Sequence, residues 1–286
     1  MRSVESPEVI ADHYPWRWYS ELSSAEDKSD ARITARGSFD RSWYQGRGVY
    51  GGLSAALALE MMSRLEPERA PRSLTLFCCA PALSGPASVE ASLERRGGRV
   101  SHLSARIYNE SEDGDARSVV VFAGASFGTP RSLDFSTPAL SPPDAPPPED
   151  VPEVPIDLPM MPAFCQHFVY RFCLDGLPYS GHSIPALGGW CDLRAPGPIT
   201  YPLIAALLDA WPPAVFAALR GPSVGASLDF SYHFLVTPEQ LGELERPFLY
   251  RGEVSHASEG YLEERDWLWD RRGVLVATAR QLIAVS

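Results

Sequence analysis

Residues 195–219 read APGPITYPLIAALLDAWPPAVFAAL, and Asp209 is the one charged side chain among them. Thr200 is a residue type that caps helices and Pro202 suits a first helical turn, so the stretch predicts a helix that begins here. The apolar residues leave this helix no polar face, which is typical of a helix buried on all sides. The two prolines after Trp211 should end it. A buried carboxylate is costly unless it is hydrogen-bonded or put to use, so Asp209 is a candidate for the chemistry.

The composition describes an ordinary globular protein. The chain has 286 residues, of which 45% are hydrophobic and 21% charged. This is enough for one large domain or two of about 140 residues. The net charge of −11, without a Lys/Arg cluster, argues against a nucleic-acid partner. No apolar run approaches the ~18 residues of a membrane span, and the polar, aromatic start shows no signal peptide, so we expect no membrane partner.

The cysteines and histidines show no metal-binding pattern. An odd number of cysteines without a CxxC pair is typical of reduced thiols in a cytoplasmic protein, and we interpret them as small buried hydrophobes. They are Cys78, Cys79, Cys165, Cys173 and Cys191. His13, His167 and His182 also lack metal-ligand spacing, so we expect no metal and no cofactor.

One order of elements is predicted twice along the chain. Residues 31–42 suggest a strand, residues 53–65 a mostly apolar helix, and four strand-like runs follow at 73–79, 87–96, 100–108 and 117–127. The later half repeats this order, with strands at 164–176 and 188–194, the helix described above, and strands at 224–235, 247–257, 260–270 and 273–285. Because the strands follow one another without helices between them, the sheets should be antiparallel.

Residues 129–162 differ from both halves in composition. They contain SPPDAPPPEDVPEVP, which can form neither a helix nor a central strand and predicts an extended linker. The chain therefore divides into an N-terminal repeat (1–128), this linker (129–162) and a C-terminal repeat (163–286).

The two halves can be aligned at a constant separation, which favours an internal duplication. Val100-Ser101-His102 and Val254-Ser255-His256 lie 154 residues apart. The same separation relates Ser73-Leu74 to Ser227-Leu228, and residues 121–123 to residues 275–277.

A strand, a long apolar helix and a run of antiparallel strands describe the α+β hot-dog fold, in which a sheet wraps around one helix. Two copies in one chain resemble the TesB-like double-hot-dog acyl-CoA thioesterases. The resemblance in the second half rests on LLDAWPP (207–213), GASLDFSYHF (225–234) and WDRRGVLVATARQ (269–281). In the first half, YGGLSAALALE (50–60) and RSLTLFCCAP (72–81) resemble the family's non-catalytic copy.

This resemblance implies an activity and a site. In the family an Asp, a Ser or Thr and a Gln of the second copy hold the hydrolytic water, and the matching residues here are Asp209, Ser227 and Gln281. The implied substrate is an acyl-CoA or acyl-carrier thioester, and a homodimer is a further expectation. The strand continues as YHFLV, where relatives often show an aromatic-His-Arg-Pro run, so the contacts near the substrate entrance should differ.

These three residue types suit thioester hydrolysis on chemical grounds as well. A desolvated carboxylate can accept the proton of water, while a hydroxyl and an amide orient that water. Backbone N–H groups at a helix or turn could stabilise the oxyanion. A nucleophilic Asp209 that forms an anhydride is an alternative. Subtracting 154 maps Gln281 onto Phe127, Ser227 onto Ser73 and Asp209 onto Ala55, which predicts one active site per chain.

Several alternatives stay open. Asp209 could instead cap a short helix that begins at Pro212, and Gln281 could point outward from the last strand. Asp229 and His233 could form the acid–histidine pair of a hot-dog hydratase, although their spacing does not favour it. A catalytically silent acyl-binding protein is a further possibility.

A rival motif is less convincing. Residues 124–128 match the G-x-S-x-G nucleophile elbow of α/β-hydrolases, but the segment after them is hostile to a helix, so we interpret the match as chance.

Overall fold

A single large antiparallel sheet dominates the computed structural model, which describes residues 8–9, 18–23, 31–113, 115–135, 137–158 and 161–285. Within these residues the sheet has 13 strands, in the order β1-β2-β3-β7-β8-β9-β6-β12-β15-β14-β13-β11-β10. Each neighbouring pair is antiparallel, as the absence of helices between the predicted strands required.

The N-terminal half supplies one end of the sheet and the longer helix. Its strands are β1 (Glu8–Val9), β2 (Trp18–Ser23), β3 (Arg32–Phe39), β6 (Ala70–Cys78), β7 (Gly85–Arg96), β8 (Val100–Glu110) and β9 (Arg117–Gly128). Helix α1 (Gly51–Leu65) follows a small hairpin of β4 (Tyr44–Gln45) and β5 (Gly48–Val49), and η2 (Arg41–Trp43) precedes that hairpin.

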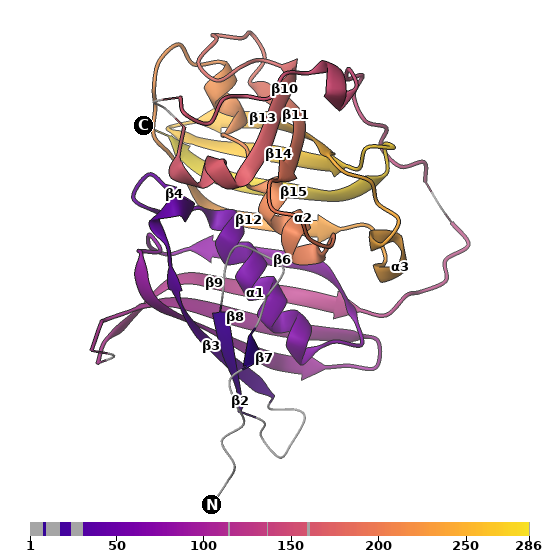
Figure 1. Ribbon diagram of the computed structural model, residues 1–286. Coiled ribbons are helices and arrows are strands. Elements are labelled where there is room, and N and C mark those ends of the chain that lie inside the picture. The colour runs from indigo at the N-terminus through magenta and orange to yellow at the C-terminus, as the bar shows by residue number, and fades with distance from the viewer. Residues whose placement is uncertain are drawn as a thin grey trace, which may run out of the picture.

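The C-terminal half repeats this arrangement. Its strands are β10 (Phe168–Asp175), β11 (Ala186–Leu193), β12 (Gly225–Phe234), β13 (Phe248–Ser258), β14 (Tyr261–Trp269) and β15 (Leu275–Val285). Its helical elements are η3 (Pro148–Asp150), η4 (Ala163–His167), α2 (Tyr201–Leu208), η5 (Ala214–Ala217) and α3 (Pro238–Leu241). In each half two paired strands, β2 and β3 or β10 and β11, precede the main helix and four strands follow it, so the predicted double hot-dog architecture is confirmed (Figure 1).

The two halves join edge to edge in the middle of the sheet. Strand β6 of the first half pairs with β12 of the second, from Ser73 opposite His233 to Phe77 opposite Asp229. The Thr75 and Ser231 hydroxyls are hydrogen-bonded across this seam at 3.0 Å. Helices α1 and α2 lie next to each other against the sheet (Figure 1).

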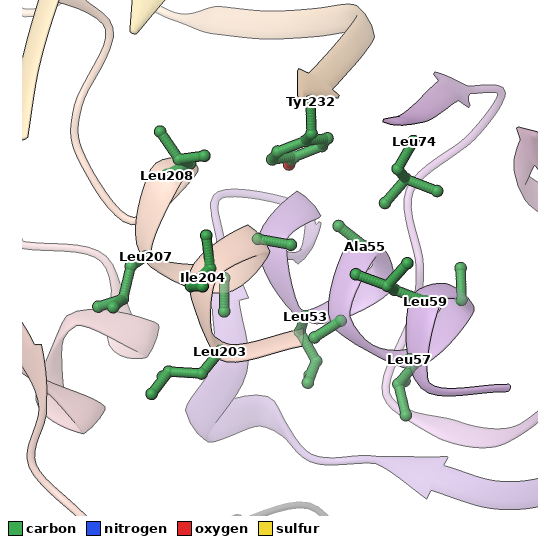
Figure 2. Close-up of a cluster of buried hydrophobic side chains, with 14 of the residues drawn as sticks. Leu53, Ala55, Leu57, Leu59, Leu74, Leu203, Ile204, Leu207, Leu208 and Tyr232 are labelled. Atoms are coloured by element: carbon green, nitrogen blue, oxygen red, sulfur yellow. The ribbon is translucent and has the colours of Figure 1, made fainter. Parts of the chain in front are cut away.

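The two helices form the centre of the hydrophobic core. All eight residues of α2 are buried, as are most residues of α1. Figure 2 shows Leu203 and Leu207 of α2 on the side away from α1, whereas Leu208 and Ala55 lie on either side of Tyr232 from the sheet. The prediction that the apolar helix is buried on all sides is thus confirmed.

Helix α2 begins as predicted and ends earlier than predicted. The Thr200 hydroxyl accepts a hydrogen bond from the Leu203 N–H at 3.2 Å, which caps the start. The helix was expected to reach Trp211, yet its last residue is Leu208. Pro212 disfavours the helical conformation at Trp211 and has no N–H of its own to donate, so the helix cannot continue through this segment.

One predicted strand also starts later than expected. Residues 164–167 belong to the 3-10 helix η4, and β10 begins at Phe168. Phe164 and Cys165 are both buried, and two consecutive side chains of a strand cannot face the same side.

The internal duplication is real, but the constant separation of 154 residues is wrong, since the matching bulges at Arg72 and Leu228, and at Val120 and Val276, lie 156 residues apart. By position in the sheet, β8 corresponds to β14, because each lies two strands away from the strand that its half contributes to the seam. Val254-Ser255-His256 lies in β13 instead, so its match to Val100-Ser101-His102 is a coincidence. The connection from β12 to β13 carries α3 and is longer than the one from β6 to β7, which changes the separation between equivalent residues.

The proline-rich segment packs on the protein. In the described part of residues 129–162, the one regular element is η3. The indole N–H groups of Trp190 and Trp269 donate to the carbonyls of Pro146 and Leu140, each at 2.9 Å. Val151 joins these tryptophans in a small hydrophobic cluster separate from the main core. Figure 1 shows the segment passing along one side of the molecule from the first half to the second.

Residues 124–128 lie inside strand β9, so the G-x-S-x-G match forms no nucleophile elbow. All five cysteines are free. Across the described residues, no helix has the length and apolar character needed to span a membrane, and no cluster of His, Cys, Asp or Glu is arranged to hold a metal ion.

Candidate active site

Ser227 and Gln281 lie on adjacent strands and are directly hydrogen-bonded. The Ser227 hydroxyl donates to the Gln281 side-chain carbonyl at 2.7 Å. Gln281 stands opposite Phe230 on β12, and both side chains are buried. Residues three apart on a regular strand would face opposite sides, so Ser227 and Phe230 share a face only because β12 has a bulge between Ser227 and Asp229.

Gln281 is held from its other end by a buried carboxyl group. Its amide Nε2 donates to Glu264 Oε1 at 3.1 Å. The second oxygen of Glu264 accepts the backbone N–H of Ala214 at 2.6 Å. Glu264 is completely buried, on strand β14 next to β15. A continuous series of hydrogen bonds therefore runs from Ser227 to the backbone at the start of η5.

A second buried carboxyl group, that of Asp266, lies next to Glu264 on β14. Asp266 is also completely buried, and the Tyr250 hydroxyl donates to its Oδ1 at 2.6 Å. Asp266 and Glu264 lie two residues apart on the buried face of β14, and burial raises the pKa of both groups, that of Glu264 to about 7. The pKa of Asp266 is raised further because it also faces the charge of Glu264, so the pair holds its proton on Asp266.

Asp209 connects the end of one helix to the start of the other. It is the C-cap residue of α2, and the N–H of Gly52 in the first turn of α1 donates to its carboxyl group. Tyr50, the N-cap residue of α1, makes no side-chain capping bond, so Asp209 caps this helix from the other repeat. A Cβ atom at Gly51 would lie 2.7 Å from Asp209 Oδ2, which explains the glycine there.

The surroundings of Asp209 raise its pKa to about 8. Desolvation by burial is the largest cause, and the nearby carboxyl of Asp266 is the second. The hydrogen bond from Gly52 lowers the pKa but does not compensate for the other two. The residue nevertheless remains partly accessible. A carboxyl group with such a pKa is a stronger base than an ordinary aspartate when it is ionised.

Two buried tyrosine hydroxyls lie in the electrostatic neighbourhood of Asp209. Tyr50 and Tyr232 are raised in pKa chiefly by burial and next by the charge of Asp209. Neither hydroxyl has a hydrogen-bond partner among the described residues. Because their pKa values lie well above 10, both remain protonated donors at physiological pH.

The structure thus places the three predicted site residues in one region, by two different kinds of contact. Ser227 and Gln281 touch directly. Asp209 is linked to them through the Glu264 and Asp266 carboxyl groups, which act on it electrostatically.

Glu264 and Asp266 were missed at the level of sequence. The signal was present in β14, where Leu262, Glu264, Asp266 and Leu268 alternate with the residues of the other face and all four are buried. Two acids on the apolar face of a strand are a recognisable exception to the pattern.

The alternative interpretations of these residues do not fit the geometry. The N-cap residue of η5 is Pro213, so Asp209 does not cap it. Gln281 faces the core and not the solvent. His233 is exposed, on the face of β12 opposite Tyr232, so it cannot join Asp229 in a buried hydratase pair.

Comparisons with known proteins agree with this architecture. A model of the acyl-CoA thioesterase N-terminal domain matches residues 39–128, and a model of the acyl-CoA thioesterase C-terminal domain matches residues 141–285. No curated protein matches the chain.

Solved structures share the fold over most of the chain. A conserved hot-dog protein of unknown function from Alicyclobacillus acidocaldarius is 28% identical, with a TM-score of 0.78 over 88% of this chain and 93% of its own. The acyl-CoA thioesterase II TesB2 from Mycobacterium marinum is 20% identical, with a TM-score of 0.67 over 93% and 96%. A bifunctional dehydratase-cyclase domain of ambruticin biosynthesis is 18% identical, with a TM-score of 0.56 over 97% and 99%. The last two likenesses concern the fold alone. With both domain models matched in tandem on a double hot-dog architecture, the chain belongs to the TesB-like acyl-CoA thioesterase family.

Proposed function

We propose that this protein hydrolyses an acyl-CoA thioester to the free acid and CoA, using a water molecule held by Asp209, Ser227 and Gln281. The observation that carries the proposal is the 2.7 Å hydrogen bond between Ser227 and Gln281, on the sheet face toward the helices, in the same region as the carboxyl of Asp209. The match to acyl-CoA thioesterase domains supports CoA as the leaving group.

The hydrogen bonds orient the attacking water. Because the Ser227 hydroxyl donates to Gln281, its lone pairs are left to accept one hydrogen of the water. The ionised Asp209 accepts the other hydrogen. A lone pair of the water oxygen is then free to point at the thioester carbonyl carbon, which is electrophilic enough to be attacked without a metal.

The reaction needs donors for the oxyanion and a proton for the sulfur. The unpartnered Tyr50 and Tyr232 hydroxyls are two donors near Asp209. These groups stabilise the negative charge that develops on the carbonyl oxygen. When the tetrahedral intermediate collapses, the C–S bond breaks, and the proton taken by Asp209 goes to the departing CoA sulfur.

A panel of acyl-CoA substrates with detection of released thiol tests the proposal. The wild type should release thiol, and Asp209→Asn should lower kcat by about 100-fold or more, because amides are not general bases. Asp229→Asn on β12 is the matched control, since this residue lies outside the hydrogen-bonded series, and it should retain activity. Ser227→Ala should lower kcat by about 10-fold to 100-fold, with Ser231→Ala on the same strand as its control.

Other outcomes identify other functions. Binding of acyl-CoA without thiol release by the wild type would show an acyl-binding protein. Hydration of an enoyl-CoA without free thiol would show a hydratase. Unchanged thiol release by Asp209→Asn would exclude the proposed base.

Two finer expectations also belong to the proposal. The five free cysteines favour a reducing compartment, and we propose the cytoplasm. We also propose a homodimer, which light scattering of the purified protein would test against its chain mass of 31.4 kDa.

A further inference from the structure

Each of the two carboxyl oxygens of Glu264 accepts a hydrogen bond from an N–H group. One accepts the backbone N–H of Ala214 at 2.6 Å, and a backbone amide cannot exchange donor for acceptor. The other accepts Nε2 of Gln281 at 3.1 Å. Since an ionised carboxylate only accepts hydrogen bonds, Gln281 must turn its NH₂ group toward Glu264 and its carbonyl away from it.

The direction of the Gln281 amide decides the direction of the Ser227 hydroxyl. The Gln281 carbonyl faces Ser227 at 2.7 Å, so the hydroxyl must donate its hydrogen to it. This leaves the oxygen of Ser227 as an acceptor for the water. A Gln281 amide turned the other way would donate to Ser227, and the hydroxyl hydrogen would then point at the water instead.

Glu264 is the more readily ionised member of the acid pair, because burial raises its pKa to about 7 while burial and the charge of Glu264 raise that of Asp266 further. Glu264 accepts two N–H donors, whereas Asp266 accepts only the Tyr250 hydroxyl at 2.6 Å in addition to its contact with Glu264. The proton of the pair therefore belongs to Asp266, whose Oδ2 has no hydrogen-bond partner among the described residues. Two acids thus carry one charge between them, and that charge is placed where Gln281 needs an acceptor.

We propose that Glu264 is a positioning residue for the proposed hydrolysis: it fixes the orientation of the Gln281 amide and thereby aims the lone pairs of Ser227 at the attacking water. The inference rests on the proposed function, and it adds a residue that touches neither the water nor the thioester.

The substitution Glu264→Gln reverses the donor and acceptor roles in the hydrogen bonds from residue 264 to Ser227, and it keeps the size and shape of the side chain. The new amide must present its carbonyl to the fixed N–H of Ala214, so its NH₂ group faces Gln281. Gln281 then turns its carbonyl toward residue 264 and its NH₂ toward Ser227, and the hydroxyl loses its acceptor. We expect kcat to fall by about 10-fold to 100-fold, with KM changed by less than about threefold, because the loss is one of orientation in the reacting complex.

Exchanging the side chains of Glu264 and Gln281 should restore the direction in which the Ser227 hydroxyl donates its hydrogen bond. In Glu264→Gln/Gln281→Glu, the amide at 264 donates to the new carboxylate at 281, and that carboxylate accepts the Ser227 hydroxyl. Ser227 again donates away from the water, and the net charge is unchanged. We expect this double variant to recover at least about 10-fold of the kcat lost in either single variant.

The measurement is steady-state thiol release from the acyl-CoA that the wild type turns over fastest. Glu263→Gln is the control, because Glu263 is the preceding residue on β14, bonds to Ser255 on the other face, and lies outside the series. Folding of each variant is checked by thermal unfolding. If Glu264→Gln does not fold, the exchange is compared with Gln281→Glu alone.

The outcomes separate this inference from the proposed function. A wild-type kcat in Glu264→Gln, or a double variant no more active than the single ones, overturns the inference and leaves the hydrolase standing. A wild type that releases no thiol from any acyl-CoA overturns both. Loss in the single variants and recovery in the exchange support the positioning role, since a merely structural role predicts additive losses.

Discussion

At the scale of single residues, Asp209 lies between two helix ends with opposite effects on its charge. The carbonyls at the end of α2 disfavour a carboxylate, while the N–H groups at the start of α1, represented by Gly52, favour it. Neither end decides the outcome, because desolvation and the neighbouring Asp266 dominate and raise the pKa to about 8. The site therefore holds a strong base that is largely protonated at neutral pH.

The first prediction concerns the pH dependence of the rate. If ionised Asp209 is the base, kcat/KM should rise about 10-fold per pH unit below pH 8 and level off above it, since only the deprotonated form accepts the proton of water. Thiol release measured from pH 5.5 to 9.5 tests this. A rate that has already levelled off near pH 5 would mean that the base has an ordinary carboxyl pKa.

The second prediction concerns stability. The folded-state pKa of Asp209 lies above its ordinary value of 3.8, so the folded protein binds a proton that the unfolded chain has released. This contribution to stability is present at low pH and is lost as the pH rises from about 4 to about 8.

An asparagine side chain at this position cannot ionise and can still accept the Gly52 N–H, so Asp209→Asn should be more stable than the wild type by at least about 2 kcal/mol at pH 9. Urea unfolding at pH 5 and pH 9 measures the difference, which should be smaller at pH 5. An equal difference at both pH values would contradict the buried carboxyl group with a raised pKa.

At the scale of elements, the site depends on two local departures from regular structure. The bulge in β12 brings Ser227 to the same face as Phe230 and Gln281. The end of α2 at Leu208, set by the prolines that follow, allows Asp209 to leave the helix and reach the first turn of α1. Glycines at positions 51 and 52 let the two helix ends approach each other, because a Cβ at Gly52 would lie 3.0 Å from the carbonyl oxygen of Ala206.

The third prediction follows from the close approach of the ends of α1 and α2. Gly51→Ala places a Cβ 2.7 Å from Asp209 Oδ2, closer than such atoms can lie, so the carboxyl group must move. We expect kcat to fall by about 10-fold or more, although alanine is the better helix former. Gly221→Ala is the control, since nothing lies within 4 Å of its Cβ position. Full activity in Gly51→Ala would show that the position of Asp209 against α1 is not needed.

At the scale of the whole molecule, the second repeat is not an independent structural unit. Its Asp209 caps a helix of the first repeat, and the sheet is continuous through β6 and β12. In β9 the residue equivalent to Gln281 is Ala125, because the matching bulges at Val120 and Val276 lie 156 residues apart, so the first repeat has no amide side chain at this place. The proline-rich segment packs against the far side of the C-terminal sheet through Trp190 and Trp269.

The fourth prediction concerns that packing. Trp269→Phe keeps most of the buried ring but removes the 2.9 Å hydrogen bond to the carbonyl of Leu140. Unfolding free energy should fall by about 1–2 kcal/mol, with kcat unchanged, because the cluster lies outside the core that holds the site. Chemical denaturation alongside Tyr261→Phe, whose side chain is exposed, measures the effect. No loss of stability would show that the segment does not hold to the sheet through this bond.

The sequence by itself determined the elements and the duplication, because hydrophobic periodicity, capping residues and prolines act over a few neighbouring positions. Asp209, Ser227 and Gln281 were singled out by the resemblance to a family, and their role stays a prediction. The sequence misled where a short identity, Val-Ser-His, was compared across loops of different length. Only the tertiary structure decided that Asp209 caps α1, that Glu264 and Asp266 are buried next to Gln281, and that the linker packs on the sheet. These contacts join segments far apart in the chain, and their energies come from desolvation and hydrogen bonding, which arise only when both repeats are folded against each other.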